Sequence, residues 1–140
     1  MSQLPVQHST LTTVRGYELD SYGHVNNSVY LNYFEHGRWK MFRDLNLNHL
    51  IQENHLILVV TDVHIRYMRE AKLYDEMEIL TRGVREDPYL IFKQKLMNRQ
   101  SGMALARAET KTIFLGENRR PVDIPKEFKS IFLPLKPDGQ

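Results

Sequence analysis

The sequence predicts an α+β fold in which one long helix packs on an antiparallel sheet of about five strands. Three observations predict it. One segment, residues 28–45, carries apolar residues at helical spacing. The second half of the chain reads as a run of strands, and short turns separate the last of them. At 140 residues one core is sufficient, so we expect a single domain over residues 1–140.

The N-terminal part supplies the first strand and the helix. Residues 7–15 are rich in Thr and β-branched side chains, which suits a strand. A polar turn follows, and a helix of about 18 residues should begin at Ser28. Asn26 or Asn27 is a suitable N-cap. The apolar face of this helix consists of Tyr30, Tyr33, Phe34, Gly37, Met41 and Leu45.

Gly37 on the apolar face of the helix costs about 1 kcal/mol of helix propensity. Such a cost is reasonable if the helix lies very close to another element at this point, and a sheet is the obvious candidate. Small residues on one face of the last strand, which should let a helix approach closely, are Ala104, Ala106, Ala108 and Thr110.

Four strands are expected after a polar linker at 46–54. The first, 56–68, begins as an apolar run and then alternates, so we expect it to be partly covered on both faces. The others are expected at 77–84, 90–96 and 104–114, and their short connections favour an antiparallel meander. Pro125 should open a short final helix.

The composition excludes several classes of function. The chain has 19 Lys and Arg against 17 Asp and Glu, and a scattered formal charge of +2 does not suggest a nucleic-acid-binding protein. A small anionic ligand remains open. The absence of Cys excludes disulfides, thiolate catalysis and Cys-based zinc sites. The six His show no H-x-x-x-H spacing on one helix, so we expect neither a metal nor another cofactor.

The sequence also bears on location and assembly. The start, MSQLPVQHST, lacks the basic and apolar regions of a secretory signal, and no run approaches the ~20 apolar residues of a membrane span. We therefore expect a soluble, cytoplasmic protein. Because a small sheet with a long apolar strand leaves an edge to be paired, we expect a homodimer or homotetramer with the sheet continued across a dimer.

The most informative segment is DSYGHVNNSVYLNYFE, which begins at Asp20 and runs from a polar turn into the predicted helix. It places a carboxylate and the imidazole of His24 at the start of a helix. From spacing alone, Asp20 with Gly23 at the fourth position also suits a type I turn. The two Asn residues that follow, Asn26 and Asn27, are capping residues by default.

With the residues that follow it, this segment reads DSYGHVNNSVYLNYFEHGR and resembles the signature of the hotdog-fold acyl-CoA thioesterases, the group that includes hydroxybenzoyl-CoA thioesterase. The order of strand, turn, helix and four strands is similar to that family over residues 7–116, and RRPVDIP resembles its exit from the last strand. The resemblance implies a hotdog fold and hydrolysis of acyl-CoA, or a related acyl thioester, to free acid and thiol. It assigns to Asp20 the role of nucleophile or general base.

Physical chemistry gives the helix start a matching role. A thioester carbonyl under attack develops negative charge on oxygen, and the unpaired N–H groups of a helix start can stabilise it. The N–H of Asn27 is the expected donor. His24 is expected either to orient Asp20 or the thioester, or simply to be a hydrogen-bonded loop residue.

The expected substrate contacts are less specific. Arg66, Arg69 and Lys72 form a basic cluster that could meet the phosphates of coenzyme A, although such a cluster is more often a solvated surface. Tyr30, Phe34 and Tyr67 could line the acyl pocket, or could be plain core. The candidate substrate-binding residues are Gly23, Asn26, Tyr30, Arg66, Tyr67 and Arg69.

Glu35 is a reserve catalytic candidate because another hotdog lineage uses a Glu on the helix. It stands ~12 Å along the axis from the helix start, and a structural ion pair with Arg38 is the better interpretation. The alternative function is a non-catalytic hotdog module that binds acyl-CoA. A hotdog dehydratase is disfavoured, since this sequence lacks the Phe-Pro-Gly stretch that a resemblance to that group would require.

Overall fold

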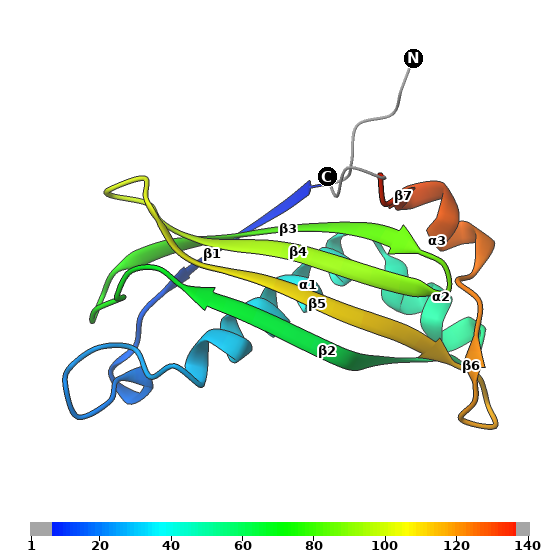
Figure 1. Ribbon diagram of the computed structural model, residues 1–140, viewed down its shortest axis with the longest axis horizontal. Coiled ribbons are helices and arrows are strands. Elements are labelled where there is room, and N and C mark those ends of the chain that lie inside the picture. Colours follow the sequence, from blue (N-terminus) through cyan, green and yellow to red (C-terminus); the bar gives the residue numbers. More distant parts are fainter. Residues whose placement is uncertain (1–6, 137–140) are drawn as a thin grey trace, which may run out of the picture.

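The computed structural model describes residues 7–136 and shows an α+β fold, a curved antiparallel sheet with helices (Figure 1). The expectations about a signal at residues 1–6 concern a segment outside this range. Within the described range no helix has the length and apolar character needed to cross a membrane.

Within residues 7–136 the sheet has seven strands rather than the five expected, because two short strands extend it. The long strands follow the order β1-β3-β4-β5-β2, and every neighbouring pair among them is antiparallel. The meander expected for the last three long strands is therefore confirmed. The strands are β1 (Gln7–Thr13), β2 (Ile57–Tyr67), β3 (Glu76–Glu86), β4 (Tyr89–Asn98), β5 (Ala104–Leu115), β6 (Pro121–Val122) and β7 (Leu133–Pro134).

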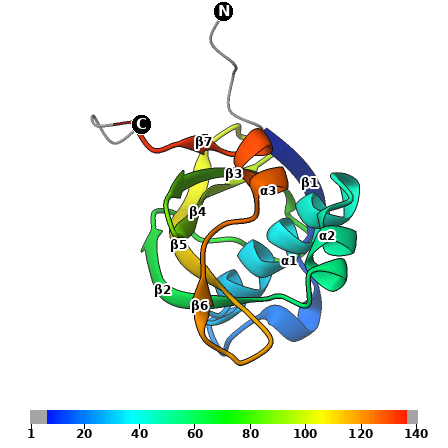
Figure 2. The same cartoon turned by 90° about the vertical axis from the view of Figure 1, so that its right-hand side faces the viewer.

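Three α-helices are described, α1 (Val29–Asp44), α2 (Leu47–Glu53) and α3 (Lys126–Ile131), with a short 3₁₀ helix at Gly16–Glu18. The sheet curves around α1, which lies in its hollow (Figure 2). The predicted apolar face of α1 is confirmed, with Leu45 half-buried and the other members buried. The short helix expected after Pro125 is α3.

The segment 46–54, expected as a polar linker, forms α2, so that prediction was wrong. Leu47 is fully buried, and Leu50 and Ile51 pack beside it against the same apolar cluster. These positions have the i, i+3, i+4 spacing of a helix face. Packing of one buried and two half-buried aliphatic side chains outweighs the polar composition of the rest of the segment.

Gly37 lets α1 lie directly on the sheet. A Cβ at this position would be 2.6 Å from Ile79 Cγ2 and 3.0 Å from Nε2 of Gln94. The sequence suggests a close approach over the small residues of β5. In the structure, α1 instead comes closest to β3 and β4. Gln94 Nε2 also donates to the carbonyl oxygen of Phe34, which ties the helix backbone to the sheet.

We expect Gly37→Ala to lower the free energy of unfolding by about 1 kcal/mol. Overpacking costs about 1–3 kcal/mol, and the gain in helix propensity offsets only about 1 kcal/mol of this. Gly16→Ala is the matched control, since nothing lies within 4 Å of its added Cβ. Chemical denaturation of both variants provides the measurement, and an unchanged or raised stability of Gly37→Ala would contradict the close packing.

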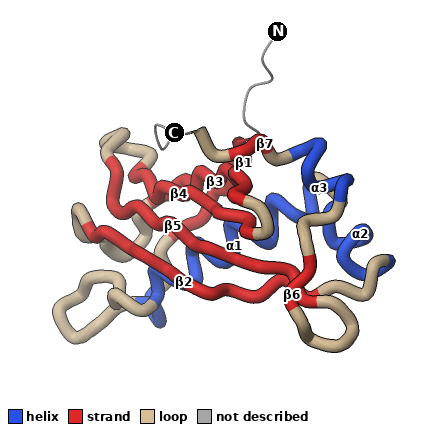
Figure 3. The backbone as a smooth tube through the Cα atoms, turned by 45° about the vertical axis from the view of Figure 1, so that its right-hand side comes forward, coloured by secondary structure: helices blue, strands red, loops and turns tan. Residues whose placement is uncertain are grey.

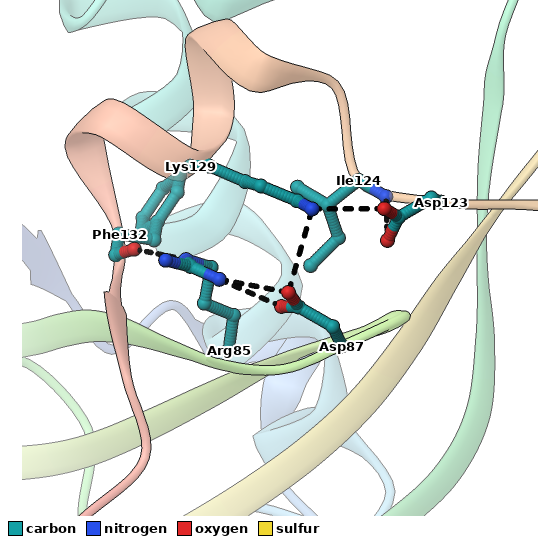
Figure 4. Close-up of polar contacts among 6 residues, drawn as sticks. All are labelled: Arg85, Asp87, Asp123, Ile124, Lys129 and Phe132. Carbon is teal, nitrogen blue, oxygen red and sulfur yellow. Dashed lines mark hydrogen bonds and ion pairs between the residues drawn. The ribbon is translucent and has the colours of Figure 1, made fainter.

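The end of the sheet that carries α2 and α3 is closed by an aromatic cluster. Phe128 of α3 contacts Phe114 edge-on, with ring centroids 5.0 Å apart, and stacks on Phe132. A polar network holds α3 to β3 (Figure 4): Arg85 binds both oxygens of Asp87 at 2.9 Å, and its Nε donates to the carbonyl oxygen of Phe132. Lys129 joins this network through Asp87 and Asp123.

Strand β2 is an edge strand, and it is partly covered on both faces as expected, since Leu58 and its neighbour Val59 are both half-buried. It pairs only with β5 among the described strands, so its other edge is open (Figure 3). Large apolar side chains on it remain exposed, including Val60 at 49%, Val63 at 43% and Tyr67 at 47%. The apolar run at its start is therefore only half-buried within the described chain.

Candidate active site

The segment from Asp20 to His24 forms a tight turn at the end of the molecule opposite α2 and α3 (Figure 1). The amide of Asp20 donates to the carbonyl oxygen of His24, and the amide of Gly23 donates to that of Asp20. Gly23 has a φ of 81°, a conformation that costs other residues about 1–2 kcal/mol. Gly23 therefore shapes the turn.

The Asp20 carboxylate is held by this turn. Its Oδ1 accepts the backbone N–H of Tyr22 at 2.9 Å and that of His24 at 3.2 Å. Its Oδ2 makes no hydrogen bond with any residue between 7 and 136. The turn-forming interpretation of Asp20 is thus correct, and it also leaves one oxygen free for chemistry.

The start of α1 leaves the amide of Asn27 without a protein acceptor among the described residues. Ser28 donates its N–H to Oδ1 of Asn26, and Val29 donates its own to the carbonyl oxygen of Asn26. The N–H of Asn27 has no acceptor within the described part of the chain. The N-cap is Ser28 rather than Asn26 or Asn27, so that prediction was wrong, and Asn26 instead holds the turn before the cap. The helix begins at Val29, one residue later than expected.

A cavity of about 620 Å³ joins these groups. It lies between the Asp20 turn, the start of α1 and the end of β2. The predicted residues that line it are Asp20, His24, Asn27, Tyr30, Tyr67 and Arg69, and the others are Tyr22, Val25, Met68 and Glu70.

The Tyr side chains form one wall. The ring of Tyr67 meets Tyr30 edge-on with centroids 5.1 Å apart, and its hydroxyl donates to the carbonyl oxygen of Asn27 at 3.0 Å. Burial raises the pKa of Tyr30. Tyr67 therefore links β2 to the start of α1. Phe34 lies elsewhere, in the buried core.

Three predicted substrate contacts do not line this cavity. Gly23 shapes the turn, and the side chain of Asn26 accepts the N–H of Ser28. Arg66 pairs with Arg107 in the sheet and lies on the face of β2 opposite to its neighbour Tyr67. Of the basic cluster expected at 66–72, only Arg69 reaches the cavity, and its guanidinium also donates to the carbonyl oxygen of Ala104 at 2.8 Å.

Comparison with known proteins gives this geometry a context. The family model described as "Thioesterase-like superfamily" matches residues 14–132, most of the chain. The chain belongs to the thioesterase-like superfamily. The hotdog resemblance drawn from the sequence agrees with this result.

Named relatives and solved structures agree with that membership. Acyl-acyl carrier protein thioesterase ATL3 of Arabidopsis thaliana is 25% identical over 128 residues, which cover 90% of this chain and 67% of ATL3. Long-chain acyl-CoA thioesterase FadM of Escherichia coli is 37% identical over 70 residues, 50% of this chain and 53% of FadM. The crystal structure of YbaW, a probable thioesterase from Escherichia coli, has a TM-score of 0.81 at 26% identity, with 88% of this chain and 94% of that chain covered. This member of the superfamily is therefore a hydrolase of acyl thioesters.

Glu70 is a residue of this thioesterase site that sequence reasoning missed. Its Oε2 lies 3.1 Å from Nε2 of His24, and both side chains line the cavity. The two residues are far apart in sequence, and the segments that carry them are joined by a bridge between His24 and Lys72 and by the bond from the Val25 amide to the Ala71 carbonyl. No local motif would have paired them.

Glu18 is a second missed residue, and it anchors the thioesterase turn to α1. Its buried carboxylate accepts the backbone N–H of Arg15 at 2.8 Å, the guanidinium of Arg15 at 2.9 Å and the hydroxyl of Tyr33 at 2.8 Å. Burial alone would raise the pKa of Glu18, but the hydrogen bonds from Arg15 and Tyr33 lower it overall. Burial, together with the bond to Glu18, raises the pKa of Tyr33.

The ion pair expected between Glu35 and Arg38 is not formed. Arg38 instead reaches the sheet, where its Nη1 donates to Oε1 of Gln94 at 3.1 Å and to Oγ1 of Thr110 at 3.5 Å. Burial lowers the pKa of Arg38, and the nearby charge of Glu35 opposes that shift. Both residues line a second, largely apolar cavity of about 350 Å³ between α1, α2 and β2.

Proposed function

We propose that this thioesterase hydrolyses acyl-CoA, or a related acyl thioester, in the cavity at the start of α1. The observation that supports the proposal is that one cavity is lined by both Asp20, whose Oδ2 is free, and Asn27, whose N–H is free, among the described residues. A carboxylate and an amide donor are the two groups that attack on a thioester carbonyl requires.

The proposed reaction begins with the thioester oxygen directed at the Asn27 N–H. Asp20 then either attacks the carbonyl carbon or removes a proton from a water molecule that attacks it. Negative charge collects on the oxygen, where the amide and the positive end of the helix dipole stabilise it. Collapse expels the thiolate, which takes up a proton. If water was the attacking group, the acyl group leaves at once as the free acid. If Asp20 attacked, the acyl group is held as a mixed anhydride on Asp20, and a water molecule hydrolyses it to the acid and restores the carboxylate.

The other cavity residues have supporting roles in this proposal. His24, held by Glu70, orients the thioester or the Asp20 carboxylate. Tyr30 and Tyr67 pack against the part of the substrate next to the thioester, and Arg69 contributes positive charge at the cavity rim.

The second cavity is the proposed place for the far end of the acyl group. It borders the same helix as the catalytic cavity, and its wall is mostly aliphatic and aromatic. Asn27 and Arg38 are separated by roughly 16 Å along the helix axis. A long acyl chain that begins at Asn27 would therefore reach it.

The assembly belongs to the same proposal. The open edge of β2 and its exposed apolar side chains favour pairing with β2 of a second copy, which would continue the sheet across a homodimer. Such pairing would cover Tyr67 and close the catalytic cavity from solvent. A homotetramer would be built from two such dimers, and the cytoplasmic location expected from the sequence completes the proposal.

A panel of CoA thioesters tests this function. Acyl-CoA substrates of increasing chain length and aryl-CoA substrates are incubated with the protein, and free thiol is measured over time. We expect thiol release that saturates with substrate and depends on chain length. Saturable binding of every substrate without thiol release would favour the non-catalytic module, and no binding would reject acyl-CoA as the ligand.

A further inference from the structure

The face of the sheet turned away from α1 carries a concentration of positive charge. It holds a cavity of about 520 Å³. Cationic side chains from β2, β3, β4 and β5 line it together with one carboxylate: Arg66, Arg82, Lys93, Lys95, Arg107 and Glu109. The whole chain has a formal charge of only +2, so this small area carries more positive charge than the protein does overall.

Three of the cations form a row across neighbouring strands. In the sheet register Arg66 is the direct partner of Arg107, and Arg107 is the direct partner of Lys95. Side chains at such positions have Cβ atoms about 4.5–5.5 Å apart, and like charges placed directly opposite destabilise a sheet. The row therefore lowers stability unless an anion neutralises it.

The three cations of this row, and Arg82 which lines the same cavity, are not neutralised within the described chain. Arg66, Arg82, Lys95 and Arg107 make no side-chain hydrogen bond or ion pair with any residue between 7 and 136. Glu109 stands opposite Lys93 and His64, not within the row of three. Three guanidinium groups and the ammonium group of Lys95 are thus left to bind an external anion.

Phosphate groups fit this arrangement best. Guanidinium groups bind phosphate oxygens in a bidentate manner, and ammonium groups add point charges. The cavity volume is within the range of about 300–1,000 Å³ that small-molecule sites have. A second copy of this face is a poor partner, since two basic surfaces repel each other.

We propose that this basic sheet cavity binds a multiply phosphorylated nucleotide. The nucleotide could be the nucleotide end of the CoA substrate, and that source rests on the function proposed above. Arg66 directly precedes Tyr67, so the basic cavity and the catalytic cavity lie on opposite faces of the same end of β2. The flexible arm of CoA would then pass around the end of the strand. Alternatively, a free nucleotide binds here as a regulator.

Adenosine 3′,5′-bisphosphate is the probe for the test, and calorimetry measures its binding to the full chain. We expect Arg107→Glu and Lys95→Glu each to weaken binding by about tenfold or more, since a lost charge-assisted contact of about 1.4 kcal/mol is a factor of ten. Both side chains are exposed, and both variants should fold. Lys126→Glu, an exposed change on α3, is the control and should bind as the parent does.

Kinetics with two substrates show whether the bound nucleotide is part of the CoA substrate or a free nucleotide. One substrate is an acyl-CoA, and the other carries the same acyl group on pantetheine, which lacks the nucleotide. If CoA itself occupies the cavity, both variants raise KM about tenfold for acyl-CoA alone, and the bisphosphate inhibits only that substrate competitively. If a free nucleotide is the ligand, the bisphosphate alters turnover of both substrates, and the variants leave KM for acyl-CoA unchanged.

Two results would overturn the nucleotide site. One is no binding of the bisphosphate to the parent at millimolar concentration. The other is equal binding to the parent, both variants and the control. Because calorimetry needs no turnover, a parent that binds the bisphosphate but hydrolyses no thioester would reject the proposed function and leave this site standing.

Discussion

Asp20→Asn is expected to lower kcat/KM for acyl-CoA hydrolysis by at least about 10²-fold, the lower limit for loss of a positioned acid or base. The Asn side chain keeps an oxygen that can accept the amides of Tyr22 and His24, so the turn should survive. What is lost is the negative charge at the free Oδ2. Steady-state thiol release gives the rate, and thermal unfolding shows whether the fold is intact.

Asp62→Asn is the matched control for this change. Asp62 is an exposed carboxylate on the outward face of β2, and its contact with the Thr61 hydroxyl can be kept by the amide oxygen. We expect parental activity from it. If Asp20→Asn hydrolyses acyl-CoA as fast as the control, Asp20 is not the catalytic carboxylate and the assignment is wrong.

Glu18→Ala is expected to lower the free energy of unfolding by about 2–3 kcal/mol. The change removes the acceptor of three donors from Arg15 and Tyr33, and the buried Tyr33 hydroxyl is left without its partner. For a domain of this size the melting temperature should fall by roughly 5–10 °C. Activity should fall as well, because Glu18 stands two residues before Asp20 and anchors the catalytic turn to α1.

The Glu18 contribution should also depend on pH. Its folded-state pKa lies below the ordinary value of about 4.3, so its stabilisation is fully present above that pH. It is lost as the pH falls through the lowered pKa, where the folded protein takes up the proton. The stability difference between the parent and Glu18→Gln should therefore shrink from pH 7 to pH 3.

Glu86→Ala, an exposed change on β3, serves as the control for both measurements and should alter stability by no more than about 0.5 kcal/mol. Equal melting temperatures for Glu18→Ala and Glu86→Ala would contradict the anchoring role. A stability difference that stayed constant down to pH 3 would contradict the pKa direction.

The parts of the fold that local rules determine could be predicted from the sequence. The alternation of the strands, the apolar face of α1 and the turn that holds Asp20 each depend on residues a few positions apart. The predicted convergence of Asp20 with the start of α1 rests on the same short segment, and both line one cavity.

The contacts that the sequence did not predict are those that depend on packing between distant segments of the chain. The hydrogen bond between Tyr33 and Glu18 and the ion pair between His24 and Glu70 form only when the chain is folded. Segment 46–54 differs from these cases, because its apolar residues have helical spacing in the sequence itself. Its polar composition led to the interpretation as a linker.

The position of Arg66 follows from strand alternation alone. The prediction places it with Arg69, because the two are close in sequence, and with Tyr67 as a substrate contact. Neighbouring residues of a strand point to opposite faces, so Arg66 and Tyr67 could not both line one cavity within a strand. Strand alternation alone would have placed Arg66 on the outer face, where the structure finds the basic cavity.

The structure of this protein bound to an acyl-CoA analogue, in which a methylene replaces the thioester sulfur, tests the central claim most directly. We expect the ketone oxygen about 2.7–3.1 Å from the Asn27 nitrogen, with an oxygen of Asp20 about 3–3.5 Å from the ketone carbon or from a water beside it. A ketone bound beyond hydrogen-bonding reach of Asn27 and away from Asp20, for example beside Glu35 in the second cavity, would contradict the account.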